Sequence, residues 1–307
     1  MLFPPHILVN IFKYLPARLL NDLIELENKV DSNSKFIKSI LYDYKFISTD
    51  DLLVDIILRY ESKLIKYCTA YGAVYDYINL PNLIGLKISL LYLDLSLNHD
   101  LQQHLTIKSL EILGYRFINK PFHQELSCLI NLECLTIQDV RILDDVLNVL
   151  PKLSHLKSLT LIDCHACDGL YQKLSECQNL KILKLERIKS LVSYHPVDID
   201  YLAKLKLVEL SMVSVSIYVI STYDIGKITT LNKLTVINSG TLYHLEAHMK
   251  ELINLRYLEI NDHYKNYISS KIVIGLPYLR SINLIQDDGS KIGIAINLTE
   301  RDNFKWP

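Results

Sequence analysis

The sequence predicts an α/β solenoid of about nine strand–turn–short-helix units, preceded by a helical N-terminal domain. One apolar pattern returns with a dominant spacing of 24 residues, and segments with apolar residues three and four apart separate its copies. Apolar residues also follow helical spacing in the first 26 positions. We therefore expect a helical domain at residues 1–47, a helical bridge at 48–89, the solenoid at 90–298 and a C-terminal tail at 299–307.

The repeated pattern is L-x-x-L-x-L, and apolar alternation of this kind predicts a strand with one buried face. Five of the eight intervals between successive fourth positions are 24 residues long. Each unit is therefore expected to begin with a strand. The pattern begins at Leu90, Ile107, Leu132, Leu156, Leu180, Leu207, Leu231, Leu255 and Leu279.

The segments between the strands predict short helices, for example DDVLNVLPKL, DGLYQKLSECQNL and TLYHLEAHMKELINL. One such unit cannot bury its own apolar face, so neighbouring units must stack and the two ends need caps. Near the C-terminus, the alternation of Ile292, Ile294, Ile296 and Leu298 predicts an edge strand that closes the stack.

The pattern resembles that of leucine-rich repeats, in which Asn or Cys follows the third apolar position. Asn98 and Cys164 occupy this position in two of the units, and other residues occupy it elsewhere. The resemblance implies a leucine-rich-repeat solenoid, with strands on a concave side and short helices on a convex side.

The first residues, MLFPPHILVNIFKYLPARLLNDLIELENKV, predict two short helices separated at Pro16. Their pattern resembles an F-box, although Glu27 stands where that motif has Cys and its following Trp is absent. The resemblance implies a surface that binds an adaptor protein. This surface would contain Phe3, Pro4, Ile7, Leu8, Ile11, Phe12, Leu15, Leu19 and Leu23.

An F-box followed by leucine-rich repeats implies a non-catalytic adaptor. The F-box would bind the Skp-type adaptor of a cullin–RING (SCF-type) ubiquitin ligase, while the repeats hold a protein substrate. Three alternatives stay open: a structural F-box subunit of a non-ligase assembly such as a yeast kinetochore complex, a repeat scaffold without F-box function, and an N-terminal stretch that is only a helical cap.

The repeats also predict a partner-binding surface, because side chains alternate across a strand and the third, fifth and seventh positions point away from the core. Alternatively, the seventh positions tuck beneath the next loop. The residues expected on the concave surface include Leu113, Ile162, Lys184, Val213, Ile237, Tyr257, Glu259 and Ile285.

Composition and motifs exclude several other functions. The formal charge of -1 and the two basic residues of the concave strands, Lys184 and Lys233, do not predict nucleic-acid or membrane binding. No Gly-rich phosphate loop occurs, and the lone C-x-x-C at Cys164 and the HLEAH segment lack the spacing of metal sites. We therefore expect no enzymatic activity and no cofactor or metal. The absence of a signal-peptide or transmembrane pattern predicts a protein of the cytoplasm, the nucleus or both.

Overall fold

The structure is a computed structural model, in which two compact units account for the chain. The first consists of Met1–Tyr115 and Asn119–Leu132, and the second of Arg116–Ile118 and Glu133–Pro307. The residues predicted to bind an adaptor, from Phe3 to Leu23, lie outside the part of the chain that the structure describes. The described residues are 45–48, 67–71, 82–90, 105–114, 122–142, 144–166, 169–190, 199–215, 222–239, 249–261, 270–286 and 288–296.

In the first unit, four parallel strands follow one another in chain order: β1 (Lys45–Ser48), β2 (Tyr67–Tyr71), β3 (Gly85–Leu90) and β4 (Ser109–Gly114). Helix α5 (Phe122–Cys128) comes after the last of them. In the register of β3 and β4, Leu86 lies opposite Leu110, which is 24 residues further along the chain. Each sequence repeat therefore adds one strand to the sheet, next to the strand of the preceding repeat.

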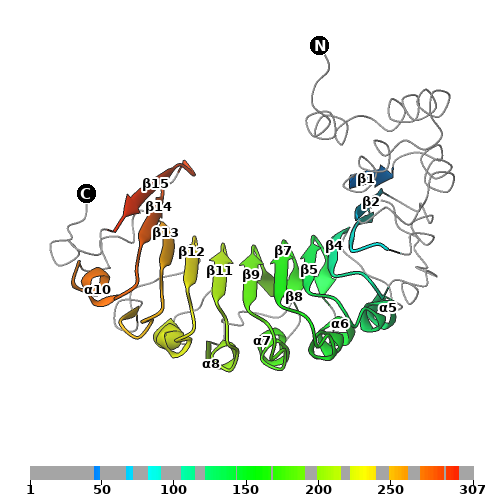
Figure 1. Cartoon of the computed structure of the whole chain (residues 1–307), viewed down its shortest axis with the longest axis horizontal. Helices are drawn as coiled ribbons and strands as arrows, with labels where there is room; N and C mark the ends of the chain where they lie inside the picture. Colours follow the sequence, from blue (N-terminus) through cyan, green and yellow to red (C-terminus); the bar gives the residue numbers. More distant parts are fainter. Residues whose placement is uncertain are drawn as a thin grey trace, which may run out of the picture. The chain divides into compact units, whose positions relative to one another are not determined.

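The second unit continues the same arrangement with strands side by side on one face and short helices on the opposite side of the coils (Figure 1). The parallel strands are β5 (Cys134–Gln138), β7 (Ser158–Ile162), β9 (Ile182–Glu186), β11 (Glu209–Val213), β12 (Lys233–Ile237), β13 (Tyr257–Asn261) and β14 (Ser281–Ile285). The helices are α6 (Asp144–Val149), η4 (Leu150–Lys152), α7 (Leu170–Leu174), α8 (Ile199–Leu202), η5 (Thr222–Lys227) and α10 (Ser270–Gly275). Three two-residue strands, β6 (Arg141–Ile142), β8 (His165–Ala166) and β10 (Lys189–Ser190), form a separate small parallel sheet.

The core of the second unit consists of the fourth and sixth positions of each repeat. These side chains are at most 1% exposed in every described strand from β5 to β14, and the fourth positions from Leu135 to Ile282 lie opposite one another along the sheet. Because stacked apolar rows of this kind are shared between neighbours, no coil is an independent core. The repeated strand is thereby confirmed as a leucine-rich-repeat fold, and α6 and α7 lie in the predicted helical segments DDVLNVLPKL and DGLYQKLSECQNL. Residues 241–248 of the third segment, TLYHLEAHMKELINL, lie outside the described residues.

Two buried side chains hold the backbone where the strands end. The Cys164 thiol lies 3.4 Å from the carbonyl oxygen of Ile137 and 3.3 Å from that of Ile162. In the same position of a later repeat, the Ser239 hydroxyl donates to the carbonyl of Met212 at 2.9 Å and accepts from the backbone N–H of Val215 at 3.2 Å. Ser239 therefore bonds to carbonyls at the same two repeat positions as Cys164 does, those of Met212 and Ile237.

The structure corrects the predicted start of the repeats. The pattern L-x-x-L-x-I at Leu83, Leu86 and Ile88 is buried and in register with β4, whereas the solenoid was expected to begin at Leu90. A Leu-rich stretch permits overlapping matches in different phases, and residues 91–95 of the match at Leu90 lie outside the described part of the chain.

The predicted helical bridge at 48–89 is also wrong where the structure describes it, because β2 and most of β3 lie in this range. The other domain limits stay predictions.

The predicted edge strand is confirmed as β15 (Lys291–Ala295), which pairs antiparallel with β14 and ends the strand order. Its apolar residues close the stack only in part. Ile292 is 39% exposed, whereas Ile296, directly after the strand, is 7% exposed.

Candidate protein-binding surface

The strand face of the second unit is the surface formed by the third, fifth and seventh positions of β5, β7, β9, β11, β12, β13 and β14. Most of these side chains are partly exposed and alternate with the buried core positions. Leu113 is on β4 in the first unit, where it is also partly exposed. The other seven predicted partner-binding residues lie on the strand face: Ile162, Lys184, Val213, Ile237, Tyr257, Glu259 and Ile285.

The seventh positions form an interrupted apolar row. Val213 and Ile237 lie opposite each other and are both partly exposed. Glu186 separates Val213 from Ile162, and the buried Asn261 lies opposite Ile285. Apart from the buried Asn261, the seventh positions of these strands are partly exposed, and only Val213 and Ile237 form a continuous apolar pair.

The residue after the seventh position turns the chain away from the strand in a left-handed conformation. Positive φ angles of 49° to 55° occur at Asp139, Asp163, Arg187, Ser214 and Asn238. The first four of these residues donate their N–H to the carbonyl of the seventh residue in the next strand. Asn and Asp tolerate this conformation better than most residues, so their recurrence at this position was a usable sequence signal.

Two of these turn residues, Asp163 and Arg187, form a bidentate ion pair. The Arg187 Nε and Nη2 atoms each lie 2.7 Å from an oxygen of Asp163, and Arg187 also contacts Glu186. The hydrogen bond from Arg187 and its positive charge hold the pKa of the Asp163 carboxyl below its usual value. The pair therefore requires the ionised carboxylate.

Asp163→Asn should lower the urea midpoint of unfolding near neutral pH, and the difference from wild type should shrink in acid. A carboxyl whose folded-state pKa is lowered adds stability that is complete above its unfolded value of 3.8 and is lost as the pH falls through the folded value. In an Arg187→Gln background, we expect the Asp163→Asn difference to be small at every pH. If the Asp163→Asn difference in urea midpoint persists in that background, the stability effect of Asp163 does not come from the ion pair.

Charged side chains gather in the middle of the strand face. The Glu209 Oε1 atom lies 3.3 Å from Lys184 Nζ and 3.0 Å from Lys233 Nζ. Partial burial alone would raise the pKa of Glu209, but the hydrogen bonds and charges of the two lysines outweigh it and lower the pKa. Glu209 was not among the residues predicted from the sequence. The repeat period could have found it, because the three residues are about one period apart.

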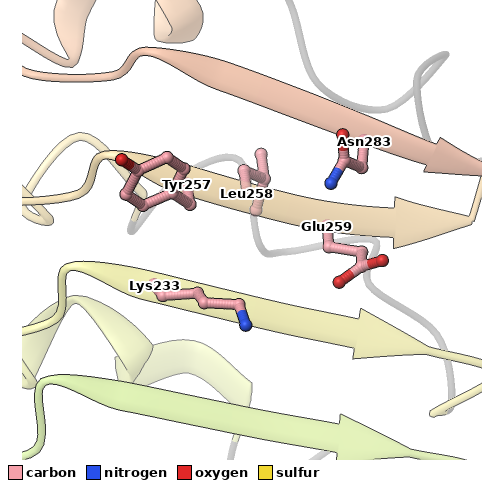
Figure 2. Close-up of a pocket in the computed structure, with 5 residues that line it drawn as sticks. All are labelled: Lys233, Tyr257, Leu258, Glu259 and Asn283. Atoms are coloured by element: carbon pink, nitrogen blue, oxygen red, sulfur yellow. The ribbon is translucent and has the colours of Figure 1, made fainter. Parts of the chain in front are cut away.

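A shallow hollow of about 270 Å³ adjoins this cluster and is lined by Lys233, Tyr257, Leu258, Glu259 and Asn283. Figure 2 shows Lys233 on β12 and Asn283 on β14, with Tyr257 and Glu259 on β13 between them. Tyr257 is 43% exposed, whereas the Glu259 side chain is 13% exposed and contacts Lys291 of β15. The hollow therefore combines an accessible aromatic ring with a recessed, paired carboxylate.

The strand face presents polar and apolar side chains, among them the exposed thiol of Cys134. Within the described ranges, no group of three or more His, Cys, Asp or Glu side chains could hold a metal ion. Burial raises the pKa of the Cys164 thiol to about 11, which keeps it protonated and unreactive near neutral pH. In the same part of the chain, no helix is long and apolar enough to cross a membrane.

Changing Val213 and Ile237 together to Ser should weaken capture of a bound protein at least tenfold, about 1.4 kcal/mol. Both side chains are partly exposed in the centre of the strand face, where interface energy tends to concentrate. The measurement pairs partner capture with the melting temperature. Ile253→Ser is the matched control, because Ile253 is 51% exposed and precedes β13. A large drop in melting temperature, together with loss of all binding, would instead show that Val213 and Ile237 belong to the core.

No protein-family model matches this chain, and no curated protein matches it. Among solved structures, an internalin (inlF) from Listeria monocytogenes is 16% identical, with 81% of this chain and 76% of that chain covered and a TM-score of 0.47. An internalin C2 (inlC2) from the same species is 19% identical, with 61% and 66% covered and a TM-score of 0.35. The PEPR1–AtPEP1 complex is 14% identical, with 73% and 32% covered and a TM-score of 0.44.

These similarities are too low to carry an argument about function. The class of protein is defined instead by the chain's own register: parallel strands one repeat apart, with buried fourth and sixth positions. The chain is a leucine-rich-repeat protein in its fold.

Proposed function

We propose that this protein is a non-catalytic adaptor whose repeats hold a protein partner on the strand face. The observation that carries the proposal is the strand face itself, on which seven successive parallel strands present partly exposed, mixed polar and apolar side chains. A broad surface with scattered hydroxyl, amide, charged and aliphatic groups suits another protein better than a small molecule, which needs an enclosed pocket.

The finer form of the proposal concerns the N-terminal stretch. Its spacing of Ile7, Ile11 and Leu15, followed by Leu19 and Leu23, resembles an F-box. On this basis, the protein is a substrate receptor of a cullin–RING (SCF-type) ubiquitin ligase. The F-box binds the Skp-type adaptor, and the repeats present the substrate.

The alternative is a structural F-box subunit of a non-ligase assembly, such as a yeast kinetochore complex. It is favoured by the composition of the chain. Tyr is abundant, with 20 residues, and so are Asn, Ile and Lys, which suits an AT-rich genome. The two proposals share the adaptor and differ in whether a cullin is present.

Affinity purification of the tagged full-length chain, followed by mass spectrometry, tests both. A Skp-type adaptor together with a cullin supports the ligase receptor. The adaptor without a cullin, in a stable complex with other subunits, supports the structural alternative. If neither the Skp-type adaptor nor a cullin is recovered, the F-box assignment is contradicted and only a repeat scaffold is left.

A further inference from the structure

Two lysines meet one glutamate at the centre of the strand face. Lys184 and Lys233 share one carboxylate oxygen of Glu209, at 3.3 Å and 3.0 Å. On the neighbouring strands, Glu259 contacts Lys291, and Glu186 contacts Arg187, which also pairs with Asp163. Within the trio of Lys184, Glu209 and Lys233, two ammonium groups therefore face a single carboxylate.

The arrangement exposes the ammonium groups and recesses the carboxylate. The side chains of Lys184 and Lys233 are 44% and 41% exposed, whereas that of Glu209 is 18% exposed. Each ammonium group has three N–H donors, so the contact with Glu209 leaves others for a ligand. An approaching group consequently meets two cations before it meets the anion beneath them.

The hollow beside this cluster adds an apolar contact. Lys233 lines the hollow and also contacts Glu209, so the two features are continuous. Tyr257 offers an accessible ring at 43% exposure, and aromatic rings pack well against aromatic and aliphatic side chains. A single side chain of a partner fits such a depression, directly next to the lysines.

We propose that the strand face recognises an acidic segment of a partner protein. An Asp or Glu carboxylate of the segment binds between Lys184 and Lys233, and a neighbouring aromatic or aliphatic side chain packs against Tyr257. This inference rests on the proposed function, because it requires that the strand face bind a protein, and it specifies the chemistry that is recognised. A nucleic acid is disfavoured as the occupant, because the described strands of this face carry two lysines rather than the basic stripe that a phosphate backbone requires.

The test is selection of phage-displayed random 12-residue peptides on the folded full-length chain. We expect enrichment of Asp or Glu next to an aromatic or aliphatic residue. With the Lys184→Glu, Lys233→Glu double variant, the charge preference should reverse toward Lys and Arg. A synthetic peptide of the wild-type consensus should bind that variant at least tenfold more weakly, and its binding to wild type should weaken as salt rises.

The control is Lys227→Glu, which makes the same substitution at one position in η5 and breaks one ion pair, with Asp200. Binding of the consensus peptide to this variant should stay within twofold of wild type. In the charge-reversed variant, the two new glutamates and Glu209 repel one another, which destabilises the fold. The melting temperature of this variant is therefore measured, and Lys184→Gln, Lys233→Gln serves as a milder second variant. That variant should also weaken binding, and Tyr257→Ala should weaken it without changing the charge preference.

The proposal is overturned if no peptide is selected, if the selected peptides show no acidic preference, or if folded lysine variants bind the consensus peptide normally. Tighter binding of a double-stranded DNA oligonucleotide that depends on the same two lysines would also overturn it. None of these outcomes bears on co-purification of the Skp-type adaptor, so failure of the recognition chemistry is distinguishable from failure of the proposed function.

Discussion

Replacing Leu183 by Ala is expected to lower the free energy of unfolding by about 2–5 kcal/mol, measured by urea denaturation. Leu183 is fully buried in the middle of the second unit and lies opposite Leu159 on one side and Leu210 on the other. Removal of its side chain leaves a cavity shared by three coils, which neighbouring backbone cannot fill without breaking the strand register.

The matched control is the next residue, Lys184→Ala, which should cost less than about 1 kcal/mol. Its side chain is 44% exposed and loses only a surface ion pair with Glu209. Equal destabilisation by the two substitutions would contradict the strand register, because a shift by one residue exchanges the buried and exposed faces.

Ile11→Asp combined with Phe12→Asp is expected to abolish co-purification of a Skp-type adaptor. The helical spacing around these residues predicts an apolar surface, and a charge placed in an apolar interface without a partner costs several kcal/mol. The melting transition of the repeats should be unchanged.

The control for the N-terminal variant is Lys13→Glu, a charge change at an already polar position of the same stretch. It should leave adaptor binding close to wild type. Wild-type adaptor recovery with the Ile11→Asp, Phe12→Asp protein would show that this stretch is not an F-box.

The sequence predicts the repeats because burial in a stacked coil demands the same apolar positions each time. From Leu110 onward, the predicted fourth positions in the described strands are the buried ones. The first repeat was misplaced because Leu90 to Leu95 imitates the pattern in a different phase. Strands β1 and β2 were missed because KFIS and YCTAY contain no Leu. Only the pairing of β2 with β3, and of β1 with β2, identifies them.

The candidate site was predictable in its geometry and less so in its charges. Alternation along each strand identified partly exposed residues such as Lys184 and Val213, but it does not say which side chains meet across strands. The repeat period supplies that information. Four pairs of residues that lie 24 positions apart in the sequence form ion pairs in the structure: Lys87–Glu111, Glu133–Lys157, Asp163–Arg187 and Glu209–Lys233.

The most direct test of the strand face as a protein-contact surface is photo-cross-linking with p-benzoylphenylalanine at Tyr257, compared with the same replacement at Tyr278. Both tyrosines are exposed, at 43% and 54%, but Tyr257 is on β13 in the strand face, whereas Tyr278 lies in the turn before β14. We expect a specific cross-linked protein from position 257 that the Val213→Ser, Ile237→Ser change removes, and little or none from position 278. Cross-linking only from position 278, or cross-linking at 257 that is unaffected by the change in the strand face, would contradict the account.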